Sequence, residues 1–407
     1  MKILYIHNDY GQPSGEEYAA ESIAQLLIEN GHTVRWFRRS SAGLDRSKYG
    51  KMKAFVAGIY NPFSAVALKR ILDSYRPDIV QVQNIYPLIS PSIFGVLKRR
   101  SIPVVMRCPN YRLFCPNGLH MVKGQVCERC LSTGRELWCV LRNCEDSLLK
   151  SIGYALRGVV ARILGSIVNN VDIFLVQSEF QKQKFVRNGI ASDRIEILPG
   201  MIPAMRPPEH ISLGDSVTFV GRISPEKGIE QFIEAANLLP DIPFIVAGDH
   251  RQMRGIRDRS PVNVRWLGFL NGDQLRDLYM KSRIVVIPSC CYEGFPNVLV
   301  QTMVLGKPTI CSAIGGLPEI VSNRETGLLF EPNNTKDLVE KISLIYFNPE
   351  LCYEFGLTAR KKAQQEYSCD MYYKRLMKAF IRAVEHKRNK AETSDSVKNR
   401  VVYQCNG

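Results

Sequence analysis

The sequence predicts an α/β protein of two domains, and three observations support this prediction. Strand-like apolar segments alternate with helix-like segments along nearly the whole chain, which is typical of parallel α/β architecture. The chain has 407 residues, which is long enough for two domains of ordinary size. A proline-rich stretch at residues 201–215 shows no hydrophobic periodicity, and we interpret it as the linker between the domains.

The first predicted domain covers residues 1–200. Its first strand, at 2–7, is followed by a turn at 11–15 and by a helix at 16–29 with its apolar residues on one face. Gly31 ends that helix. The remaining strands of the first sheet are predicted at 34–37, 78–82, 103–106, 172–177 and 195–198.

The second predicted domain covers residues 216–368. Its strands are predicted at 217–220, 244–247, 264–267, 283–288, 308–311 and 327–330, and its closing helices at 335–347 and 350–366. A final helix is predicted at 369–386. Residues 387–407 are polar and rich in charge, so we expect a disordered tail there.

Two strand-to-helix turns in the second domain have the composition of an anion-binding site. One strand ends at Gly221-Arg222, and the chain turns through Ser-Pro before a helix opens near Lys227. Another apolar strand precedes a second helix opening, which runs from Glu293 through Gly-Phe-Pro to Asn297. Helix N-termini and backbone N–H groups bind diphosphates, Arg adds a bidentate fork and Lys adds a point charge. The two turns therefore predict a diphosphate-binding cleft.

These motifs and their order resemble the retaining GT-B glycosyltransferases of family 4, the group 1 glycosyltransferases that use nucleotide sugars. The resemblance runs from Lys2 to about Phe380 and is most specific in the C-terminal half. There the chain contains, in order, Gly-Arg-x4-Lys-Gly, Trp-Leu-Gly, Pro-Ser, Glu-Gly-Phe-Pro-Asn, Gly-Lys-Pro and Gly-Gly-Leu-Pro-Glu. The resemblance implies a GT-B fold, in which two Rossmann-like domains face a central cleft and a crossover helix returns to the first domain.

The resemblance also implies roles for individual residues. Arg222 and Lys227 would contact the donor pyrophosphate, and Glu293 would contact the transferred sugar; these three are the implied catalytic residues. The other implied donor-binding residues are Gly15, Gly221, Gly268, Gly294, Phe295, Pro296, Asn297 and Gln301. Front-face transfer with retention needs no enzyme nucleophile, because the protein only positions the substrates and stabilises the leaving diphosphate. We therefore expect no cofactor for catalysis.

Two positions depart from the family pattern. The second Glu of the Glu-x7-Glu motif, which normally binds ribose, is Gln301 here; Gln keeps an acceptor but lacks the charge. A His that often lies near the reacting sugar is replaced by Pro109. We therefore interpret Asn110, Tyr111 or Arg112 as the sugar or acceptor contacts, with Arg112 suited to a phosphate. The two departures also leave open a catalytically silent relative.

The cysteines gather in a predicted insert at residues 108–144, which holds six of the chain's twelve. Cys127 and Cys130 have the Cys-x2-Cys spacing that binds Zn²⁺, and two further thiolates would come from Cys115, Cys139 or Cys144. Such a zinc would be structural, because it would hold together a long loop with little core. The alternative is a set of small buried apolar side chains, which is about as well supported, and an iron–sulfur cluster is a weaker third reading.

The formal charge of the chain is +15, and residues 1–200 carry most of it, with 27 Lys and Arg against 16 Asp and Glu. Such a balance favours an anionic partner. A helix at 148–168, with Lys150, Arg157 and Arg162 away from its apolar side, fits either an anionic membrane surface or an ordinary core. No apolar run reaches membrane-spanning length, and the N-terminal run is short for a signal peptide. We expect a cytoplasmic protein, peripherally attached to the inner face of the plasma membrane.

The predicted function is transfer of a sugar from a UDP- or GDP-sugar to a glycan or a polyprenyl-diphosphate-linked acceptor, in bacterial surface polysaccharide synthesis. The enzymatic alternative is a sugar transferase with a soluble acceptor. The non-enzymatic alternative is a zinc-bearing nucleic-acid-binding protein. Because the insert lacks interleaved aromatic and basic residues, we expect no nucleic-acid partner.

Overall fold

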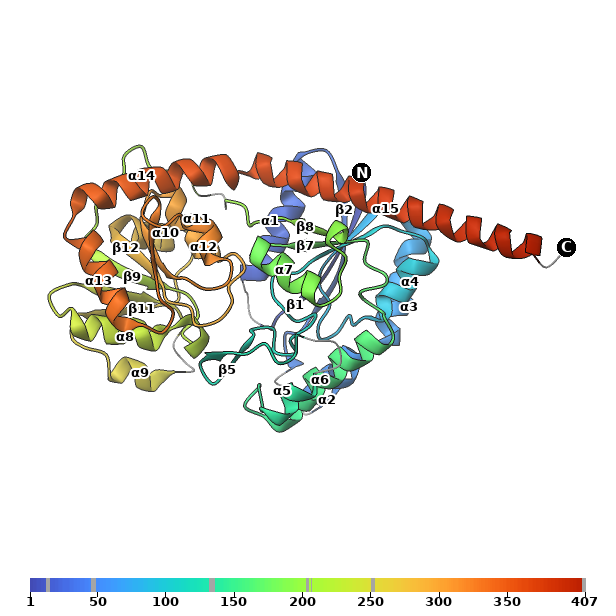
Figure 1. Cartoon of the computed structure of the whole chain (residues 1–407), viewed down its shortest axis with the longest axis horizontal. Coiled ribbons are helices and arrows are strands. Elements are labelled where there is room, and N and C mark those ends of the chain that lie inside the picture. Colours follow the sequence, from blue (N-terminus) through green and yellow to red (C-terminus); the bar gives the residue numbers. More distant parts are fainter. Residues whose placement is uncertain are drawn as a thin grey trace.

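The structure is a computed structural model that describes residues 1–11, 15–44, 49–131, 136–202, 205, 207–249 and 253–404, with the backbone alone at 51, 254, 391 and 393–404. It contains two six-stranded parallel sheets, each with helices packed around it (Figure 1). The predicted α/β class with two Rossmann-like domains is therefore confirmed. No helix of the described ranges combines the length and the apolarity needed to cross a bilayer.

The first sheet has the strand order β2-β1-β3-β4-β7-β8, and all its neighbours pair in parallel. All six residues of β3 are buried, as expected for a strand covered on both faces. In this order the connections from β1 lead first to β2 on one side and then to β3 on the other, so the strand order reverses between β1 and β3 and creates a crevice at the carboxyl ends of these strands. The strands are β1 Lys2–Asp9, β2 Thr33–Ser40, β3 Ile79–Asn84, β4 Val104–Arg107, β7 Ile173–Val176 and β8 Ile195–Ile197.

The second sheet has the order β11-β10-β9-β12-β13-β14, again entirely parallel. Here the strand order reverses between β9 and β12, which is where open α/β sheets bind nucleotides. Both turns singled out in the sequence follow these two strands. The strands are β9 Ser216–Val220, β10 Phe244–Ala247, β11 Val264–Gly268, β12 Ser282–Ile287, β13 Thr309–Ser312 and β14 Gly327–Phe330.

The helices of the first domain surround its sheet, and a short insert lies at its edge. The insert is not a plain loop: it holds an antiparallel hairpin of β5 Met121–Val122 and β6 Gln125–Val126 and the short helix α5 Leu137–Leu141. The other helices are α1 Gly15–Glu29, α2 Gly50–Ile59, α3 Pro62–Ser74, α4 Ser92–Arg99, α6 Leu148–Ile163, α7 Glu179–Arg187 and the 3-10 turn at Ser192–Arg194.

The helices of the second domain begin at recognisable caps. The side chains of Asn334 and Asn348 each accept a hydrogen bond from the first turn of the helix that follows. The helices are α8 Ile229–Leu238, α9 Arg254–Asp258, α10 Gly272–Lys281, α11 Asn297–Val304, α12 Leu317–Ile320, α13 Thr335–Tyr346 and α14 Pro349–Glu366, with a 3-10 turn at Pro225–Lys227.

The last helix, α15, covers Cys369–Gln404 and crosses back onto the first domain (Figure 1). Leu376, Ala379, Phe380 and Ala383 are fully buried and belong to a core cluster with residues of β1 and α1. The crossover helix is thus present, but it does not end at 386. The helix continues to Gln404, through residues where we predicted a disordered tail, because Lys, Arg, Ala and Glu in this segment favour helix as well as solubility.

The two domains are also joined through side chains near the cleft. Both carboxylate oxygens of Glu319, in α12, accept hydrogen bonds of 2.7 Å from the backbone N–H groups of Glu179 and Phe180 at the start of α7. A carboxylate at a helix N-terminus satisfies free N–H groups and complements the helix dipole. A residue of the second domain therefore caps a helix of the first.

Candidate active site

A cavity of about 290 Å³ lies between the two domains. Its second-domain wall follows the ends of β9 and β12 and contains Arg222, Lys227 and Glu293. Its first-domain wall contains Gly15 and Gln177. The structure thus brings the three predicted catalytic residues to one cavity, together with the predicted donor residues Gly15, Gly294, Phe295 and Asn297 and the predicted acceptor residue Asn110.

Lys227 and Glu293 form an ion pair in this wall, with Nζ 2.5 Å from Oε1. Ser289 also donates a hydrogen bond of 2.7 Å to the same carboxylate oxygen. Burial opposes ionisation of both partners, but their mutual attraction prevails, so the pKa of Lys227 is raised and the pKa of Glu293 is lowered. Both groups are therefore charged at neutral pH.

Arg222 offers a more exposed charge. Its side chain is 70% exposed and lies 3.1 Å from the Glu226 carboxylate, which is mostly buried. Lys227 ends the 3-10 turn after Arg222, and Gly228 follows with a φ of +71°. A Cβ on Gly228 would lie 1.7 Å from the carbonyl oxygen of Pro288, so only glycine permits this approach of the two turns.

The turn at Glu293 is also packed closely. A Cβ on Gly294 would lie 2.6 Å from the amide oxygen of Gln177, which comes from the first domain. Gln177 directly follows β7, so its place at the cleft follows from the parallel sheet, but the sequence analysis did not single it out. The signal that could have identified Gln177 is that it is a polar residue directly after a buried strand.

Four predicted donor-binding residues, Gly221, Gly268, Pro296 and Gln301, do not line this cavity. Gln301 and Asn297 lie one turn apart on α11, as predicted, but the amide oxygen of Gln301 accepts a hydrogen bond of 3.0 Å from the hydroxyl of Tyr279. Gly268 has a φ of +72° at the end of β11.

The three acceptor candidates of the first domain have different environments. Asn110 lines the interdomain cavity. Tyr111 is a core residue that is 1% exposed and packs edge-on against His120. Arg112 lies in a neighbouring cavity of the first domain, where its Nη1 donates a hydrogen bond of 3.1 Å to the Tyr10 hydroxyl.

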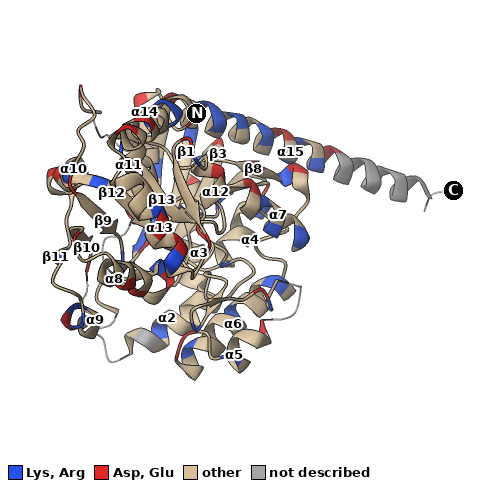
Figure 2. Cartoon of the chain, turned by 60° about the vertical axis from the view of Figure 1, so that its left-hand side comes forward, with Lys and Arg blue, Asp and Glu red and all other residues tan. Residues whose placement is uncertain are grey.

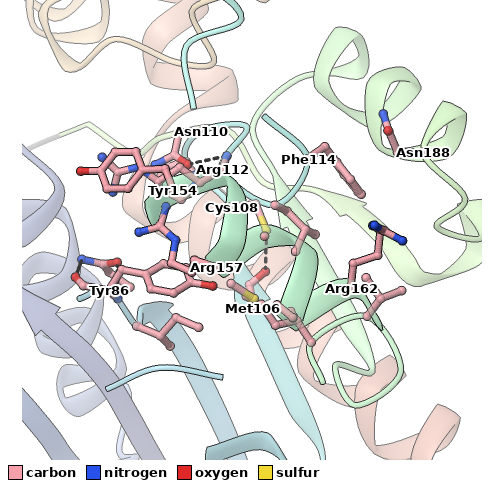
Figure 3. A pocket seen from close by; sticks show the side chains of 18 of the residues that line it. Tyr86, Met106, Cys108, Asn110, Arg112, Phe114, Tyr154, Arg157, Arg162 and Asn188 are labelled. Atoms are coloured by element: carbon pink, nitrogen blue, oxygen red, sulfur yellow. Dashed lines mark hydrogen bonds between the residues drawn. The ribbon is translucent and has the colours of Figure 1, made fainter. Parts of the chain in front are cut away.

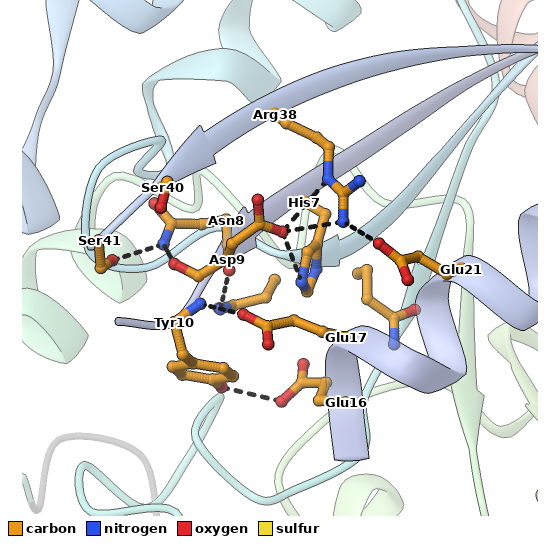
Figure 4. Close-up of polar contacts among 12 residues, drawn as sticks. His7, Asn8, Asp9, Tyr10, Glu16, Glu17, Glu21, Arg38, Ser40 and Ser41 are labelled. Atoms are coloured by element: carbon orange, nitrogen blue, oxygen red, sulfur yellow. Dashed lines mark hydrogen bonds and ion pairs between the residues drawn. The ribbon is translucent and has the colours of Figure 1, made fainter. Parts of the chain in front are cut away.

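A polar network at the carboxyl end of β1 supports this side of the cleft (Figure 4). The Tyr10 hydroxyl donates to Glu16 at 2.8 Å, and burial raises the pKa of Glu16. Asp9 is paired with Arg38 at 3.2 Å. Residues 12–14 of the predicted Gly-rich loop lie outside the described residues. The sequence analysis did not find this network, because its members come from β1, β2 and α1.

His7, Asp9 and Glu17 belong to the same network and form a group that could hold a metal ion. Their ligand atoms all lie within 4.8 Å of one another, and the described residues contain no other such group of three or more His, Cys, Asp and Glu. His7 is fully buried, and burial lowers its pKa to about 4. Glu17 accepts the backbone N–H of Tyr10 at 2.5 Å. The carboxylates of this set are thus already engaged with protein donors.

The cysteines of the insert cluster only loosely. Cys130, Cys139 and Cys144 share a small apolar cluster, and burial raises the pKa of Cys130 to about 12. Cys115 donates a hydrogen bond of 3.0 Å to Asn117, and Cys127 accepts one of 3.4 Å from Arg142. Thiols are the donors that Zn²⁺ prefers, but no three of these sulfurs lie within 4.8 Å of one another in the part of the chain described. The donor type fits zinc and the spacing does not.

The insert also reaches the turn of the second domain that contains Glu293. Glu128 accepts a hydrogen bond of 2.7 Å from the hydroxyl of Tyr292, the residue before Glu293, and is paired with Lys184. Leu119 and Met121 pack against Cys290 and Cys291. The insert thus contributes to the interface between the domains.

The helix predicted at 148–168 is shorter than predicted, and its apolar side is exposed. It ends at Ile163, and Gly165 follows with a φ of +55°. Leu149 and Ile163 of its apolar side are 78% and 70% exposed, whereas Arg157 is buried. Arg157 thus lies away from the apolar side, as expected, but it is buried, because it stacks on the rings of Tyr86 and of Tyr154 in the same helix (Figure 3).

Comparison with known proteins places the second domain in a family. Residues 210–362 match the family of glycosyl transferases group 1. The chain is 26% identical over 249 residues to an exopolysaccharide phosphotransferase of Streptomyces coelicolor, covering 57% of this chain and 26% of that protein. It is 24% identical over 353 residues to an uncharacterized 42.6 kDa protein in the cps region of Klebsiella pneumoniae, covering 79% and 87%.

A third relative is the N,N'-diacetylbacillosaminyl-diphospho-undecaprenol alpha-1,3-N-acetylgalactosaminyltransferase of Campylobacter jejuni, 30% identical over 179 residues, covering 42% of this chain and 45% of that protein. Two of these three matches thus span less than half of the relative. Among solved structures, the sucrose-phosphate synthase of Thermosynechococcus elongatus gives a TM-score of 0.68 at 16% identity, covering 97% of this chain and 99% of that one. HepE of Anabaena in complex with UDP-glucose gives 0.60 at 17%, covering 97% and 100%. The chain has the GT-B fold with a group 1 glycosyltransferase domain.

Proposed function

We propose that this chain is a retaining hexosyltransferase of family 4 that transfers a sugar from a nucleotide diphosphate sugar to a glycan or lipid-linked acceptor. The observation that carries the proposal is the convergence of Arg222, Lys227 and Glu293 on one interdomain cavity at the ends of β9 and β12. Two cations and the N-terminus of α11 meet there, which suits a diphosphate. The match of residues 210–362 to the group 1 family supports the same reading.

In this proposal the protein acts by positioning and by electrostatic stabilisation. The bond between the anomeric carbon and the diphosphate oxygen breaks, and a bond to an acceptor hydroxyl oxygen forms on the same face of the sugar. The hydroxyl proton passes to the leaving diphosphate. Lys227 and Arg222 stabilise the charge that develops on the diphosphate, and Glu293 orients the sugar and holds Lys227 in place.

The identity of the donor and the acceptor is inferred from what the names of similar proteins say they bind or act on. HepE, which shares the fold, is described in complex with UDP-glucose, and this favours a UDP-sugar over a GDP-sugar. The Campylobacter relative acts on a diphospho-undecaprenol acceptor, and the Klebsiella relative lies in a cps region. A polyprenyl-diphosphate-linked acceptor in surface polysaccharide synthesis is thus the version that we propose. The place of action would be the cytoplasmic face of the membrane.

We also retain the structural zinc as a proposal. It would be held by Cys127 and Cys130, with two further ligands from Cys115, Cys139 and Cys144. Binding would have to draw the sulfurs closer than they lie here, which is a form of coupling between metal and local folding.

Thermal unfolding with nucleotide sugars tests the function. A ligand at 100 times its Kd stabilises the native state by about 2.7 kcal/mol, so a panel of UDP- and GDP-sugars should contain one that raises Tm. Lys227→Ala should remove that response. Product analysis by NMR then gives the anomeric configuration. If no nucleotide sugar shifts Tm of the wild type, the proposal is wrong.

A further inference from the structure

The side chain of Tyr292 reaches from the second domain into a socket of the first domain. Its ring centre lies 4.7 Å from that of Phe180, 5.9 Å from that of His120 and 6.2 Å from that of Tyr111. All three neighbours belong to the first domain, and Tyr292 also packs against the main core cluster of that domain. Aromatic rings at these distances attract one another and restrict the position of the ring between them. The first domain therefore holds Tyr292 in place.

The polar end of Tyr292 is held by a carboxylate of the insert. Its hydroxyl donates a hydrogen bond of 2.7 Å to Oε1 of Glu128, and the same oxygen accepts a hydrogen bond from the ammonium group of Lys184. Helix α7 carries three basic residues, which are blue in Figure 2, and Lys184 is the buried one. A buried ammonium group needs a partner charge, so the ion pair with Lys184 keeps the Glu128 carboxylate where the tyrosine hydroxyl meets it.

The ammonium group of Lys184 also contacts the rings of the socket. Its Nζ lies 4.9 Å from the ring centre of Phe180 and 5.2 Å from that of Tyr292. A cation over the face of an aromatic ring is attracted by it. Lys184 thus holds Tyr292 in two ways, through the ring and through Glu128.

Glu128 belongs to the same short segment of the insert that lines the interdomain cavity. Gly118 and Leu119 line the cavity at the beginning of this segment. The segment is closed on itself, because β5 pairs with β6 and the N–H of Cys127 donates a hydrogen bond of 2.7 Å to the carbonyl oxygen of His120. One hairpin of the insert thus supplies a wall of the cavity at one end and the anchor of Tyr292 at the other.

Tyr292 directly precedes Glu293, the residue that would contact the transferred sugar. On its other side this turn is held by a hydrogen bond of 2.8 Å from the N–H of Gly316 to the carbonyl oxygen of Glu293. Because consecutive Cα atoms keep a fixed separation, Tyr292 cannot move in its socket without moving the backbone of Glu293. A displacement of about 1 Å in a positioned group can cost a factor of about 100 in rate. The socket therefore acts on the sugar contact.

The geometry of this contact favours positioning over simple adhesion between the domains. The carboxylate of Glu319 already joins the second domain to the start of α7. Ring contacts alone would add adhesion, whereas a hydroxyl directed at a carboxylate also fixes the orientation of the ring, because charge-assisted hydrogen bonds are strong and directional.

We propose that Glu128 is a positioning residue for sugar transfer. Through the hydroxyl of Tyr292 it sets the place of Glu293 against the transferred sugar, so the Cys-rich insert takes part in the active site. This inference rests on the proposed glycosyltransferase function. It adds a residue that acts on the sugar contact although it does not itself line the cavity.

Calorimetry with two probes tests this role. The probes are the nucleotide sugar that raises Tm most in thermal unfolding and the corresponding nucleoside diphosphate without the sugar. Tyr292→Phe keeps the ring and removes the hydroxyl, so it should weaken the nucleotide sugar about tenfold and leave the nucleoside diphosphate within about twofold of the wild type. Glu128→Gln should have the same effect, and the double variant should be no weaker than either single variant, because both changes remove one contact.

Two further variants keep the test independent of folding. Glu128→Gln leaves the buried Lys184 without a partner and is expected to lower stability. Glu128→Gln with Lys184→Met removes both charges and should show the same loss of affinity for the nucleotide sugar. Asp146→Asn removes an exposed acid just after the insert and should bind both probes as the wild type does. Tm shows that each variant is folded.

Hydrogen exchange followed by mass spectrometry reports on the turn without any ligand. The amides of residues 291–295 should exchange faster in Tyr292→Phe and in Glu128→Gln than in the wild type and in Asp146→Asn, because the turn has lost an anchor. Wild-type exchange in both variants would overturn the inference, whether or not nucleotides bind. Unchanged affinity for the nucleotide sugar, or equal weakening of the two probes, would also overturn it, because Glu128 would then not act on the sugar contact. If the wild type binds no nucleotide sugar but exchange still rises in the variants, the proposed function fails while the link from Glu128 to Glu293 stands.

Discussion

Lys227 and Glu293 come from two different turns of the second domain and form an ion pair, with Nζ 2.5 Å from Oε1. The pair joins the helix opening after β9 to the turn after β12, so it fixes the geometry of the cavity wall. In our proposal Lys227 therefore has two partners, Glu293 in the protein and the diphosphate of the donor. The two contributions can be separated by experiment.

Lys227→Ala leaves a buried carboxylate without its partner, and we expect it to lower the free energy of unfolding by about 3–5 kcal/mol. The double variant Lys227→Ala with Glu293→Gln should recover most of that stability, because no charge remains, while sugar transfer stays low in both. Tm and turnover measured side by side check this. Recovery of turnover together with stability would show that Lys227 acts only through the fold.

Arg222→Ala serves as the matched exposed variant. Because the Arg222 side chain is 70% exposed, the loss of its ion pair with Glu226 should lower stability by no more than about 1 kcal/mol. Turnover should nevertheless fall about tenfold or more, since a charge-assisted contact to the diphosphate is lost. Near-normal turnover would remove Arg222 from the catalytic residues.

Gln301 can be tested against its own hydrogen-bond partner. If its amide binds the donor ribose, Gln301→Leu should weaken donor affinity, Gln301→Glu should preserve or improve it, and Tyr279→Phe should change it little. Tyr279→Phe is the control because it removes only the hydrogen bond to the Gln301 oxygen. Calorimetry measures the Kd of the donor for each variant. The same donor affinity for Gln301→Leu, Gln301→Glu and wild type would show that this residue does not contact ribose.

The sequence predicted the positions of the strands along the chain and the two turns that line the interdomain cavity, because both depend on local patterns. Buried strands such as β7 read as continuous apolar runs, and the Gly-Arg and Glu-Gly turns carry their residues in a short span. Since carboxyl ends of parallel strands meet at one edge, Arg222, Lys227 and Glu293 could be expected to converge.

The orientation of α6 could not be predicted in the same way. An amphipathic helix has the same pattern whether its apolar side faces the core or the outside, and only the structure shows that Leu149 and Ile163 face outward while Arg157 packs on tyrosine rings. The cap that Glu319 provides for α7 joins residues about 140 positions apart, and no local pattern predicts it.

Metal content tests the cysteine cluster. Protein purified without chelator should contain close to one zinc per chain, and Cys130→Ser should lose it, since thiolate ligands couple the metal to local folding. Cys369→Ser is the control, because Cys369 is exposed and lies outside the insert. The second domain should keep its nucleotide response in both variants. Elemental analysis of fresh protein without zinc or iron would favour the reading of ordinary buried cysteines.

Glu319→Gln tests the contact between the domains. The carboxylate accepts two N–H groups of α7, and an uncharged amide complements the helix dipole less well, so we expect a loss of about 0.3–1 kcal/mol at the interface. A larger fraction of open molecules should then appear as an increased radius of gyration in small-angle scattering. Glu325→Gln, an exposed change nearby, should leave the scattering unchanged. An unchanged radius for Glu319→Gln would mean that other contacts hold the domains.

Lys307 gives the protein a dependence of stability on alkaline pH. It is 1% exposed, and its Nζ donates hydrogen bonds to the carbonyl oxygens of Ser212 and Met280 at 2.7 and 2.8 Å. Burial lowers the pKa of Lys307 to about 8 from its usual 10.5. Between these two values the unfolded chain holds a proton that the folded chain has lost, so the stability contributed by this residue rises with pH.

We expect the free energy of unfolding to gain about 1.4 kcal/mol per pH unit from Lys307 between pH 8 and 10.5, relative to Lys307→Met. Lys281→Met, which removes an exposed lysine at the end of α10, should keep the wild-type slope. Urea titrations of the three proteins across this range measure the difference. A wild type and a Lys307→Met variant with parallel pH profiles would show that the two carbonyl acceptors keep Lys307 charged in the folded protein.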